Sequence, residues 1–389
     1  MYFLAIKEQA ALKLRKGYPW IYASAITEST HPSLEPGDLV QVVHHRKRLG
    51  IGYYNSKTAL ACRMLSFDSN ATIDETFFKH KFIKALQHRS QYFNLPYYRL
   101  VHAEADALPG LVIDRFGSTL VCQTSTAGME KLKVFWLPAL KAVLQPTRII
   151  LRDDVPLREK EGLTREVQSY LGSMTDPIEF EENGVHFETN PSDSQKTGWF
   201  FDQRDNRRWL AEKSKDKRVL DLYTYMGGFG LSAARKGARQ VTLVDASGHA
   251  LALAQQAAQQ NQLATVCDFV QADVFKLLPD YIQAGKQFDI LIADPPAFIK
   301  QSEHIAAGLR GYQKLARLCA QVVRPGGLFF MASCSHHADH QRFKEVVEAG
   351  IAQAGRKANL LRKSGADKDH PVHPLLPESQ YLKALTYRL

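Results

Sequence analysis

The sequence predicts an α/β protein whose C-terminal half forms a mostly parallel, doubly wound sheet. Four successive apolar runs, each typical of a buried strand, contain or are followed by a carboxylate: Asp221, Asp245, Asp273 and Asp294. A glycine-rich turn at residues 226–230 follows the first run. The carboxyl ends of parallel strands meet at one edge of such a sheet, where this fold binds ligands. We therefore expect the four acids to line one nucleotide-binding site.

The glycine turn begins this expected site. After the predicted strand at residues 219–222, Gly227 and Gly228 let a ligand approach the backbone without meeting a Cβ atom. Asp245 follows the second strand, where a carboxylate accepts hydrogen bonds from ribose hydroxyls. Residues 228–233 also satisfy the pattern G-x-G-x-x-A, so a nicotinamide or flavin enzyme is an alternative. One acid alone could be only a helix N-cap, but four in register favour ligand binding.

Residues 1–72 predict a small β-rich module that combines cations with aromatic side chains. Residues 14–22 interleave Arg15 and Lys16 with aromatic residues, and residues 44–48 place a cationic run on a predicted hairpin tip. Cations reach phosphates and aromatic rings stack on bases, so the mixture suits RNA. In the alternative interpretation, Trp20 belongs to the core and the cationic run is a solvated turn.

Residues 73–177 predict a second α/β unit that spaces the first module from the C-terminal domain. A helix is expected from Ile73 to about Phe93, with acids near its start, where the helix dipole favours them. Residues 157–163 are expected to be a solvated connection. No catalytic constellation is evident in this unit.

The C-terminal domain, residues 178–389, is expected to open with a hairpin at residues 178–189, because Asn183-Gly184 separates two alternating runs. A polar and aromatic loop follows at residues 195–207. Its side chains include candidates for contact with a cofactor or substrate, while Asp202 could instead cap a helix.

Cys334 is the expected nucleophile of the site. It follows an apolar run at residues 328–333, so it should emerge at the same sheet edge as Asp294. A thiolate that attacks C6 of cytosine makes C5 nucleophilic enough to take a methyl group, which is covalent catalysis. Asp294 could stabilise charge at N3 and the exocyclic amine of the base. The other four cysteines are expected to be inert.

These motifs carry three resemblances. The glycine turn and the order of acids resemble the S-adenosylmethionine-dependent methyltransferases, and residues 15–22 resemble the PUA domain, a small RNA-binding β-barrel. Residues 195–198, 202–204, 225–229, 294–296, 333–335 and 381–383 together resemble the bacterial large-subunit ribosomal RNA cytosine-C5 methyltransferase I family. The resemblance covers essentially the whole chain.

The resemblance implies a Rossmann-like class I methyltransferase domain behind a PUA domain and a small central α/β domain. It implies S-adenosyl-L-methionine as cofactor, 5-methylcytosine in 23S ribosomal RNA as product, and Cys334 as nucleophile, with Asp294 as a second catalytic residue. The expected cofactor-binding residues are Lys196, Thr197, Asp202, Arg204, Asp221, Tyr223, Gly227, Gly228, Phe229, Asp245, Ala246, Asp273, Val274 and Asp294. The expected RNA-binding residues are Arg15, Lys16, Trp20, Arg46, Lys47, Arg48 and Phe298.

Two departures from the family pattern lie on the substrate side. Ala297 follows Asp-Pro-Pro where the family usually has lysine, and His336 replaces the usual glycine after Ser-Cys-Ser. An RNA base N-methyltransferase is therefore an alternative, although Ala297 separates the Asp-Pro-Pro motif from Phe298 and a cysteine would have no role. A non-catalytic RNA-binding or assembly factor that keeps the cofactor is a third possibility.

Composition agrees with an RNA partner. The formal net charge is +10 and the isoelectric point is near 9.2, which favours a polyanionic partner such as ribosomal RNA. Five scattered cysteines without ligand spacing predict neither a disulfide framework nor a metal site. No signal peptide or membrane-spanning segment is expected, so we expect a cytoplasmic protein, without a membrane partner, that could form a homodimer.

Overall fold

The structure is a computed structural model that describes residues 2–29, 34–191, 197–299 and 301–389. Its contacts divide the chain into two compact units. The N-terminal unit comprises Met1–Ile178, Thr189–Trp199 and Lys368–Ser379, and the C-terminal unit comprises Glu179–Glu188, Phe200–Asp367 and Gln380–Leu389. The division into three domains at residues 72 and 177 stays a prediction.

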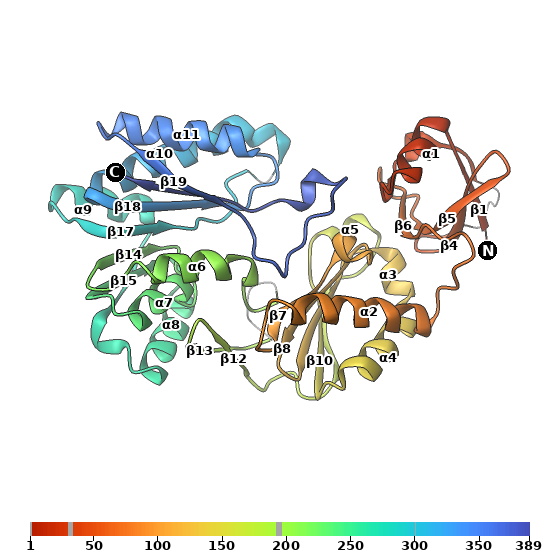
Figure 1. The fold of residues 1–389 in the computed structure, drawn as a ribbon, viewed down its shortest axis with the longest axis horizontal. Helices are drawn as coiled ribbons and strands as arrows, with labels where there is room; N and C mark the ends of the chain where they lie inside the picture. Colours follow the sequence, from red (N-terminus) through yellow and green to blue (C-terminus); the bar gives the residue numbers. More distant parts are fainter. Residues whose placement is uncertain (1, 30–33, 192–196, 300) are drawn as a thin grey trace. The chain divides into compact units, whose positions relative to one another are not determined.

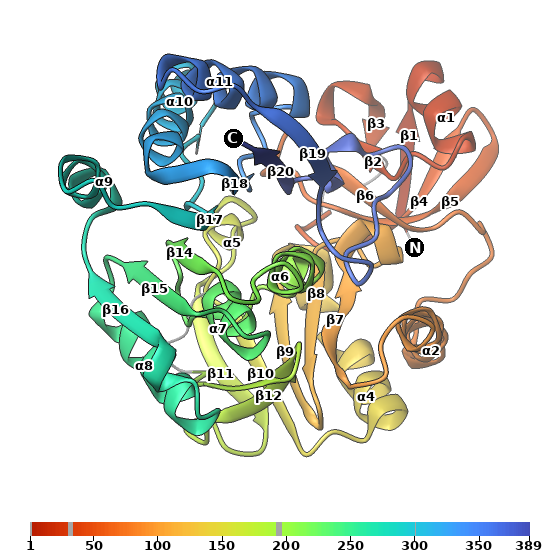
Figure 2. The ribbon, with the colours of Figure 1, turned by 60° about the vertical axis from the view of Figure 1, so that its left-hand side comes forward.

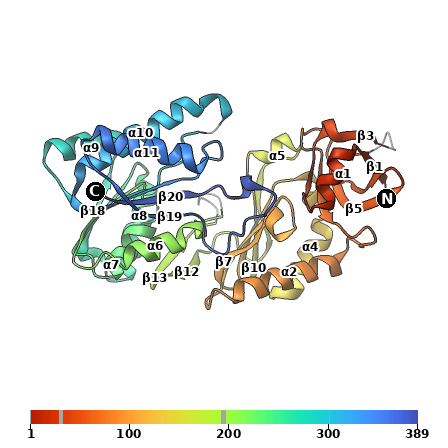
Figure 3. The ribbon, with the colours of Figure 1, turned by 45° about the horizontal axis from the view of Figure 1, so that its top comes forward.

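The first sheet of the N-terminal unit has six strands in the order β2-β6-β5-β4-β1-β3. Its elements are β1 Tyr2–Ile6, α1 Glu8–Arg15, β2 Trp20–Ile21, β3 Ile26–Ser29, β4 Leu39–His44, β5 Lys47–Tyr54 and β6 Cys62–Ser66. The pair β1–β4 is parallel, and the other pairs are antiparallel. Helix α1 contacts β5, and its Ala11 and Leu14 join strand residues in one apolar core (Figure 3). The predicted hairpin is β4–β5.

The second sheet of this unit has the order β11-β10-β9-β8-β7. Its elements are α2 Glu75–Ser90, β7 Tyr97–His102, β8 Leu111–Phe116, β9 Thr119–Thr124, α3 Ala127–Lys131, α4 Lys133–Leu144, β10 Arg148–Asp153, α5 Leu157–Lys160 and β11 Glu166–Leu171. Helices α2 and α4 contact each other, and α2 contacts β7 (Figure 2). The predicted helix from residue 73 is confirmed as α2, whose N-cap Asp74 accepts a hydrogen bond from the Phe77 amide.

The two sheets of the N-terminal unit share a core, because Ile51 and Leu65 of the first sheet belong to the apolar cluster of the second. A buried polar cluster accompanies it. The Glu161 carboxylate accepts hydrogen bonds from Arg63 at 2.9 Å and from Asn55 at 2.6 Å. The expectation of a solvated connection at residues 157–163 is therefore wrong for Arg158 and Glu161, whereas Leu157, Glu159, Lys160 and Gly162 are exposed. Arg158 and Glu161 are about 1% exposed, because each charged group has hydrogen-bonding partners in the interior.

The C-terminal unit contains a seven-stranded sheet in the order β16-β15-β14-β17-β18-β20-β19 (Figure 1). Its elements are α6 Arg204–Ala211, β14 Arg218–Leu222, α7 Gly228–Arg235, β15 Gln240–Asp245, α8 Gly248–Gln260, β16 Cys267–Gln271, α9 Val274–Gln283, β17 Phe288–Ala293, α10 Ile305–Val322, β18 Val323–Ser333, α11 His340–Gln353, β19 Asn359–Ser364 and β20 Lys383–Arg388. Strands β14–β18 run parallel, and β20 is antiparallel to both of its neighbours.

Helices cover both faces of this sheet. In Figure 1, α10 and α11 lie on one side, with α6, α7 and α8 on the other. Contacts of α10 with α9 and α11, and of α6 with α7, agree with these layers. The predicted α/β class and the mostly parallel, doubly wound sheet are confirmed. The predicted hairpin is confirmed as β12 Ile178–Glu182 and β13 Val185–Thr189, with Asn183 and Gly184 both at positive φ.

No helix among the described residues is long and apolar enough to cross a membrane.

Candidate active site

The turn between β14 and α7 is strained. Tyr223, Tyr225 and Gly227 have φ values of 62°, 53° and 82°, so left-handed conformations occur at three of five successive residues. Non-glycine residues adopt this conformation at a cost, and such residues cluster at ligand sites. The turn wraps the chain tightly around the carboxyl end of β14, next to the N-terminus of α7.

Asp221 stabilises this turn through two hydrogen bonds. Its Oδ2 atom accepts hydrogen bonds from the Thr224 hydroxyl and from the Gly230 amide at 2.8 Å. Its Oδ1 atom is buried and has no hydrogen-bond partner among the described residues. Burial raises the pKa of Asp221 to about 6, although the two hydrogen bonds act in the opposite direction. Asp221 therefore stabilises the turn through Oδ2, and its buried Oδ1 atom is left for a ligand.

The second and third acids lie at the carboxyl ends of their strands, as predicted. Asp245 ends β15 and accepts hydrogen bonds from the Tyr225 and Ser247 amides, both at 2.9 Å. Asp273 follows β16 and is the N-cap of α9, where it accepts from the Lys276 amide at 3.1 Å. Both acids thus have local structural partners as well as places at the ligand edge. Ala246 is exposed and Val274 is buried beside them.

Asp294 directly follows β17, the neighbour of β14 on the other side. Its pKa is raised to about 7, mainly by burial and also by the negative charges of Asp202 and Asp221, while Arg207 and a hydrogen bond from Gln203 act in the opposite direction. A carboxyl group with this pKa is partly protonated at neutral pH. It can therefore donate a hydrogen bond as well as accept one.

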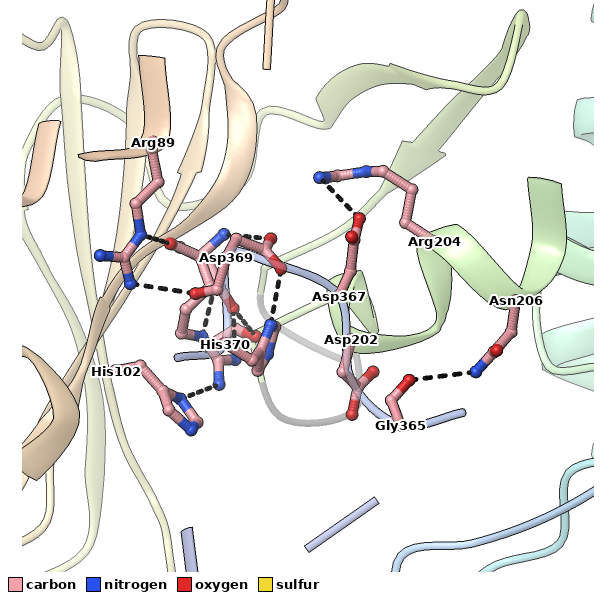
Figure 4. A network of polar contacts seen from close by, with 12 residues as sticks. Arg89, His102, Asp202, Arg204, Asn206, Gly365, Asp367, Asp369 and His370 are labelled. Carbon is pink, nitrogen blue, oxygen red and sulfur yellow. Dashed lines mark hydrogen bonds and ion pairs between the residues drawn. The ribbon is translucent and has the colours of Figure 1, made fainter. Parts of the chain in front are cut away.

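Asp202 and Arg204 precede the sheet in the C-terminal unit. Asp202 does not cap α6, whose N-cap is Gln203. Its Oδ2 atom accepts a hydrogen bond from the Tyr381 hydroxyl, while its buried Oδ1 atom has no partner within the described part of the chain. Arg204 points toward Asp367 at 3.7 Å (Figure 4) and also pairs with Glu182 at 3.4 Å. These ion pairs give Arg204 a structural role, and cofactor contact stays a prediction.

Two predicted cofactor ligands fall elsewhere. Lys196 lies outside the described residues. Thr197 belongs to the N-terminal unit, where its hydroxyl donates a hydrogen bond to Asp114, which also pairs with Arg99 at 2.7 Å. In the same unit, Asp369 accepts the Arg99 amide at 2.9 Å, and its carbonyl oxygen accepts from Arg89 at 3.0 Å (Figure 4). Cofactor binding by Lys196 and Thr197 stays a sequence prediction.

Cys334 follows β18, which pairs with β17 in parallel, so the cysteine and Asp294 follow neighbouring strands as predicted. Hydroxyl groups connect the loop that follows β17 to the loop that follows β18. The Tyr312 hydroxyl lies 2.8 Å from Ser335 Oγ and 2.9 Å from Ser333 Oγ, and it accepts the Phe298 amide at 3.3 Å. Tyr312 lies outside every motif recognised in the sequence, and α10 brings it to this position only in the folded chain.

The other cysteines differ from Cys334. Cys62, Cys122 and Cys319 are buried, while Cys267 and Cys334 are half-buried. Burial raises the pKa of Cys62 and of Cys267 to about 12, and raises the pKa of Cys122 and Cys319 as well. These four thiols stay protonated near neutral pH and are poor nucleophiles.

A cavity of about 540 Å³ opens beside the Asp-Pro-Pro loop. Its lining consists of Phe275, Phe298, Gln301, His304, Ala307, Gly308 and Gly311. The Phe298 ring packs on the Tyr312 ring with a centroid distance of 4.6 Å, so one edge of the cavity is joined to the hydroxyl cluster. An aromatic wall with a few polar groups at the rim suits a flat heterocycle.

The predicted RNA-binding side chains of the N-terminal unit differ in exposure. Arg46, Lys47 and Arg48 are exposed at the β4–β5 tip, and Arg15 and Lys16 are exposed at the end of α1. Trp20 is half-buried, and its indole N–H donates to Glu104 at 2.9 Å. This hydrogen bond favours a structural role for Trp20, whereas the cations remain available for a polyanion.

One group of metal-ligating side chains lies close together within the described residues. Ligand atoms of Glu8, His44 and His45 lie within 4.8 Å of one another, and His44 Nε2 pairs with Glu8 Oε2 at 2.9 Å. Two imidazoles and a carboxylate could hold a zinc-like cation.

Comparisons with known proteins agree with this geometry. The family model described as S-adenosylmethionine-dependent methyltransferase matches residues 166–387, and that of a PUA-like domain matches residues 4–67. The chain is therefore an S-adenosylmethionine-dependent methyltransferase with a PUA-like module. Its cofactor is S-adenosylmethionine, and the predicted Rossmann-like methyltransferase fold is confirmed.

Curated relatives define the family more narrowly. A protein of Pseudoalteromonas atlantica named ribosomal RNA large subunit methyltransferase I is 38% identical over 96% of this chain and 95% of its own. The chain belongs to the ribosomal RNA large subunit methyltransferase I family. Among solved structures, a Streptococcus mutans chain described as a SAM-dependent methyltransferase has a TM-score of 0.83 at 22% identity, covering all of both chains. Another methyltransferase structure, complexed with SAH, has a TM-score of 0.85 at 22% identity over the same coverage.

The residues of the C-terminal unit fit this cofactor. Two buried carboxylate oxygens, of Asp202 and Asp221, have no hydrogen-bond partner among the described residues. Asp221 contacts the strained turn, and Asp202 lies close enough to Asp294 for its charge to raise the pKa of that carboxyl group. S-Adenosylmethionine carries a sulfonium and an ammonium group, and such oxygens would pair with its positive charge.

Proposed function

We propose that this enzyme forms 5-methylcytosine in 23S ribosomal RNA through a covalent adduct between Cys334 and the target base. The proposal rests on the placement of Cys334 after β18, beside the strand that presents Asp294, with both loops joined by the hydroxyls of Tyr312 and Ser335. A cysteine at this place has a chemical role in C5 methylation and none in N-methylation.

Cys334 would act first. Its thiolate forms a bond to C6 of cytosine, and the electron pair of the C5–C6 double bond moves to C5, which becomes the nucleophile. Bound S-adenosylmethionine supplies the electrophilic methyl group. Once C5 carries this methyl group, a base removes the C5 proton, the bond between sulfur and C6 breaks, and the thiolate returns. The ring regains its aromatic character.

Asp294 would assist the attack. In its protonated form the carboxyl group donates a hydrogen bond to N3, which draws charge away from C6 and makes this carbon more electrophilic. The pKa of about 7 keeps a protonated fraction available at neutral pH.

The cofactor would occupy the glycine turn and the sheet edge. Asp245 is placed to accept the ribose hydroxyls, and Asp273 and Val274 are placed near the adenine. The proposed cofactor residues in this unit are Asp202, Asp221, Tyr223, Gly227, Gly228, Phe229, Asp245, Ala246, Asp273, Val274 and Asp294.

RNA binding would use both units by different means. The exposed cations of residues 46–48 would contact phosphates, which suits the PUA-like module. Phe298 would offer a stacking surface for a base at the cavity. The named substrate of the curated relatives, large-subunit ribosomal RNA, supports this substrate class.

The test uses wild type, Cys334→Ala and, as a matched control, Cys267→Ala, which removes another half-buried thiol. Each protein is incubated with methyl-labelled S-adenosylmethionine and unmodified 23S ribosomal RNA, and the labelled nucleoside is identified. We expect 5-methylcytidine from wild type and Cys267→Ala, and none from Cys334→Ala, with cofactor binding intact in all three.

A trapping experiment tests the covalent step. RNA that contains 5-fluorocytidine cannot lose a proton from C5, so wild type should remain attached to it on a denaturing gel and Cys334→Ala should not. Label on an exocyclic nitrogen, surviving in Cys334→Ala, would favour the N-methyltransferase alternative. Cofactor binding without turnover on any RNA would favour an assembly factor.

A further inference from the structure

Lys383 is a buried cation next to the proposed nucleophile. It begins β20, which pairs with β18 so that Lys383 lies opposite Ser333. Its Nζ atom donates a hydrogen bond to the Ser335 carbonyl oxygen at 2.6 Å. Lys383 thus contacts Ser333 and Ser335, the two residues on either side of Cys334. Lys383 is 2% exposed.

Lys383 has no directly paired counter-ion. In the part of the chain that the structure describes, no carboxylate forms an ion pair with Lys383, and its Nζ atom donates to an uncharged carbonyl oxygen. A buried ammonium without a counter-ion is costly, and proteins seldom retain one without a function. Burial lowers the pKa of Lys383, whereas the charges of Cys334 and Asp339 raise it.

Other titratable groups lie near Cys334 and Lys383. Tyr312 comes from α10; burial raises its pKa, its hydrogen bonds lower it, and the charge of Cys334 adds a smaller increase. His340 comes from the start of α11, and its pKa is lowered by burial and by the charge of Lys383. His336 follows the cysteine, with its ring 5.6 Å from that of Tyr381. Among these groups, Lys383 is the ammonium that touches the Cys334 segment directly.

We propose that Lys383 is a positioning residue that activates Cys334 by holding the negative charge of its thiolate. This role rests on the proposed function and deepens it. The S–H bond breaks, the proton passes to water, and the ammonium keeps its three protons while its positive charge offsets the new charge on sulfur. The hydrogen bond to the Ser335 carbonyl oxygen fixes the ammonium at the residue that follows Cys334, so activation does not depend on bound RNA.

Two variants separate charge from structure. Lys383→Gln keeps a donor that can reach the Ser335 carbonyl oxygen but has no charge, and Lys383→Arg keeps the charge. Lys357→Met removes an exposed lysine and serves as the control. The rate of Cys334 alkylation by iodoacetamide is measured against pH by peptide mass spectrometry in the full-length proteins.

We expect the midpoint of Cys334 alkylation to rise by about one pH unit in Lys383→Gln, with about tenfold slower reaction at neutral pH. Lys383→Arg and Lys357→Met should keep a midpoint close to wild type. An unchanged midpoint in folded Lys383→Gln would overturn the proposal and leave Lys383 a structural residue. If Lys383→Gln does not fold, Lys383→Met is measured in the same way with the same criterion.

The readout also separates this inference from the proposed function. Alkylation needs neither RNA nor cofactor. One outcome is a raised alkylation midpoint in Lys383→Gln together with methylation by Cys334→Ala at the wild-type level. This outcome would reject the covalent adduct but confirm that Lys383 lowers the pKa of the Cys334 thiol. The opposite pattern, a loss of 5-methylcytidine in Cys334→Ala with no shift in Lys383→Gln, would reject Lys383 alone.

Discussion

Asp294 makes the proposed reaction dependent on pH, because its carboxyl group titrates near pH 7. Catalysis needs this group protonated and Cys334 deprotonated, so kcat/KM should follow a bell-shaped pH profile with one limb near pH 7. Asp294→Asn has an amide that donates at every pH. This variant should lose the alkaline decline of the profile, with a maximum lowered by about 100-fold. Steady-state kinetics on RNA fragments provide the measurement.

Asp268→Asn is the matched control for this profile, because Asp268 is an exposed carboxylate and the second residue of β16, away from the carboxyl end of the strand. Its profile should match wild type. An alkaline decline that persists unchanged in Asp294→Asn would show that another group supplies the proton.

The raised pKa of Asp221, about 6, also predicts how the cofactor binds. A sulfonium beside this carboxylate favours its ionised form, so binding releases a proton and tightens as pH rises. Between pH 5.5 and 8 the affinity for S-adenosylmethionine should increase by about fourfold as Asp221 ionises. S-Adenosylhomocysteine lacks the sulfonium charge and should show a weaker dependence. Isothermal titration in two buffers of different ionisation enthalpy counts the released protons, and equal slopes for the two ligands would contradict the prediction.

The raised pKa values of Asp221 and Asp294 also determine how the folding stability changes with pH. The ordinary pKa of an aspartate is 3.8, and the folded values are about 6 and about 7. Between about pH 3.8 and pH 7, the folded protein without cofactor therefore binds more protons at these two groups than the unfolded chain does. Stability contributed by these two groups is present below pH 3.8 and is lost as pH rises toward 7.

At the scale of elements, the packing of α7 against the sheet depends on Gly230, which lies in the first turn of this helix. A Cβ atom at Gly230 would lie 2.8 Å from Leu243 Cδ2 and 3.1 Å from Asp221 Oδ2. Gly230→Ala should therefore push α7 away from the sheet, lower stability by about 1–3 kcal/mol and weaken cofactor binding. Thermal unfolding and cofactor titration measure both effects.

Gly248→Ala is the control, because its Cβ atom would meet only the end of the flexible Gln271 side chain at 3.1 Å. Its melting temperature should stay close to wild type. If Gly230→Ala were equally harmless, close packing of α7 would not explain the glycine.

The β4–β5 tip is an element whose role depends on charge. Replacement of Arg46, Lys47 and Arg48 by alanine should weaken RNA binding uniformly and reduce the slope of log K against log salt by about 2. The folded state should keep its stability, because these side chains are exposed. Filter binding at several salt concentrations measures the slope. Glu181→Ala and Glu188→Ala, at half-buried positions of the β12–β13 hairpin, should leave the slope unchanged.

At the scale of the whole molecule, the PUA-like module and the second sheet fold as parts of one unit. The Arg63–Glu161 pair joins them, with the Glu161 side chain fully buried. Arg63→Met removes the cation and leaves a buried carboxylate, so stability should fall by about 3–5 kcal/mol. Arg165→Met breaks an exposed pair with Glu159 and should cost less than about 1 kcal/mol. Chemical denaturation gives both values, and similar losses would contradict the central role of Glu161.

Much of the site could be predicted because its signals are local. A buried strand followed by a carboxylate, a glycine turn and an Asn-Gly hairpin depend on neighbouring residues and on backbone geometry. The strand ends at Asp221, Asp245 and Asp294 were therefore expected where the structure has them. Asp202 was wrongly considered as a helix cap, because its partner Tyr381 is almost two hundred residues away in the chain.

The sequence by itself determined the fold class, the cofactor and the position of Cys334 along the chain, since each follows from short patterns of apolar, acidic and glycine residues. Only the tertiary structure decided that Lys383 lies opposite Ser333, that Tyr312 joins the two loops, and that Glu161 is buried. These three facts depend on which strands and helices become neighbours. A charged or hydroxyl side chain reveals its function only when the fold removes its water and supplies its partners.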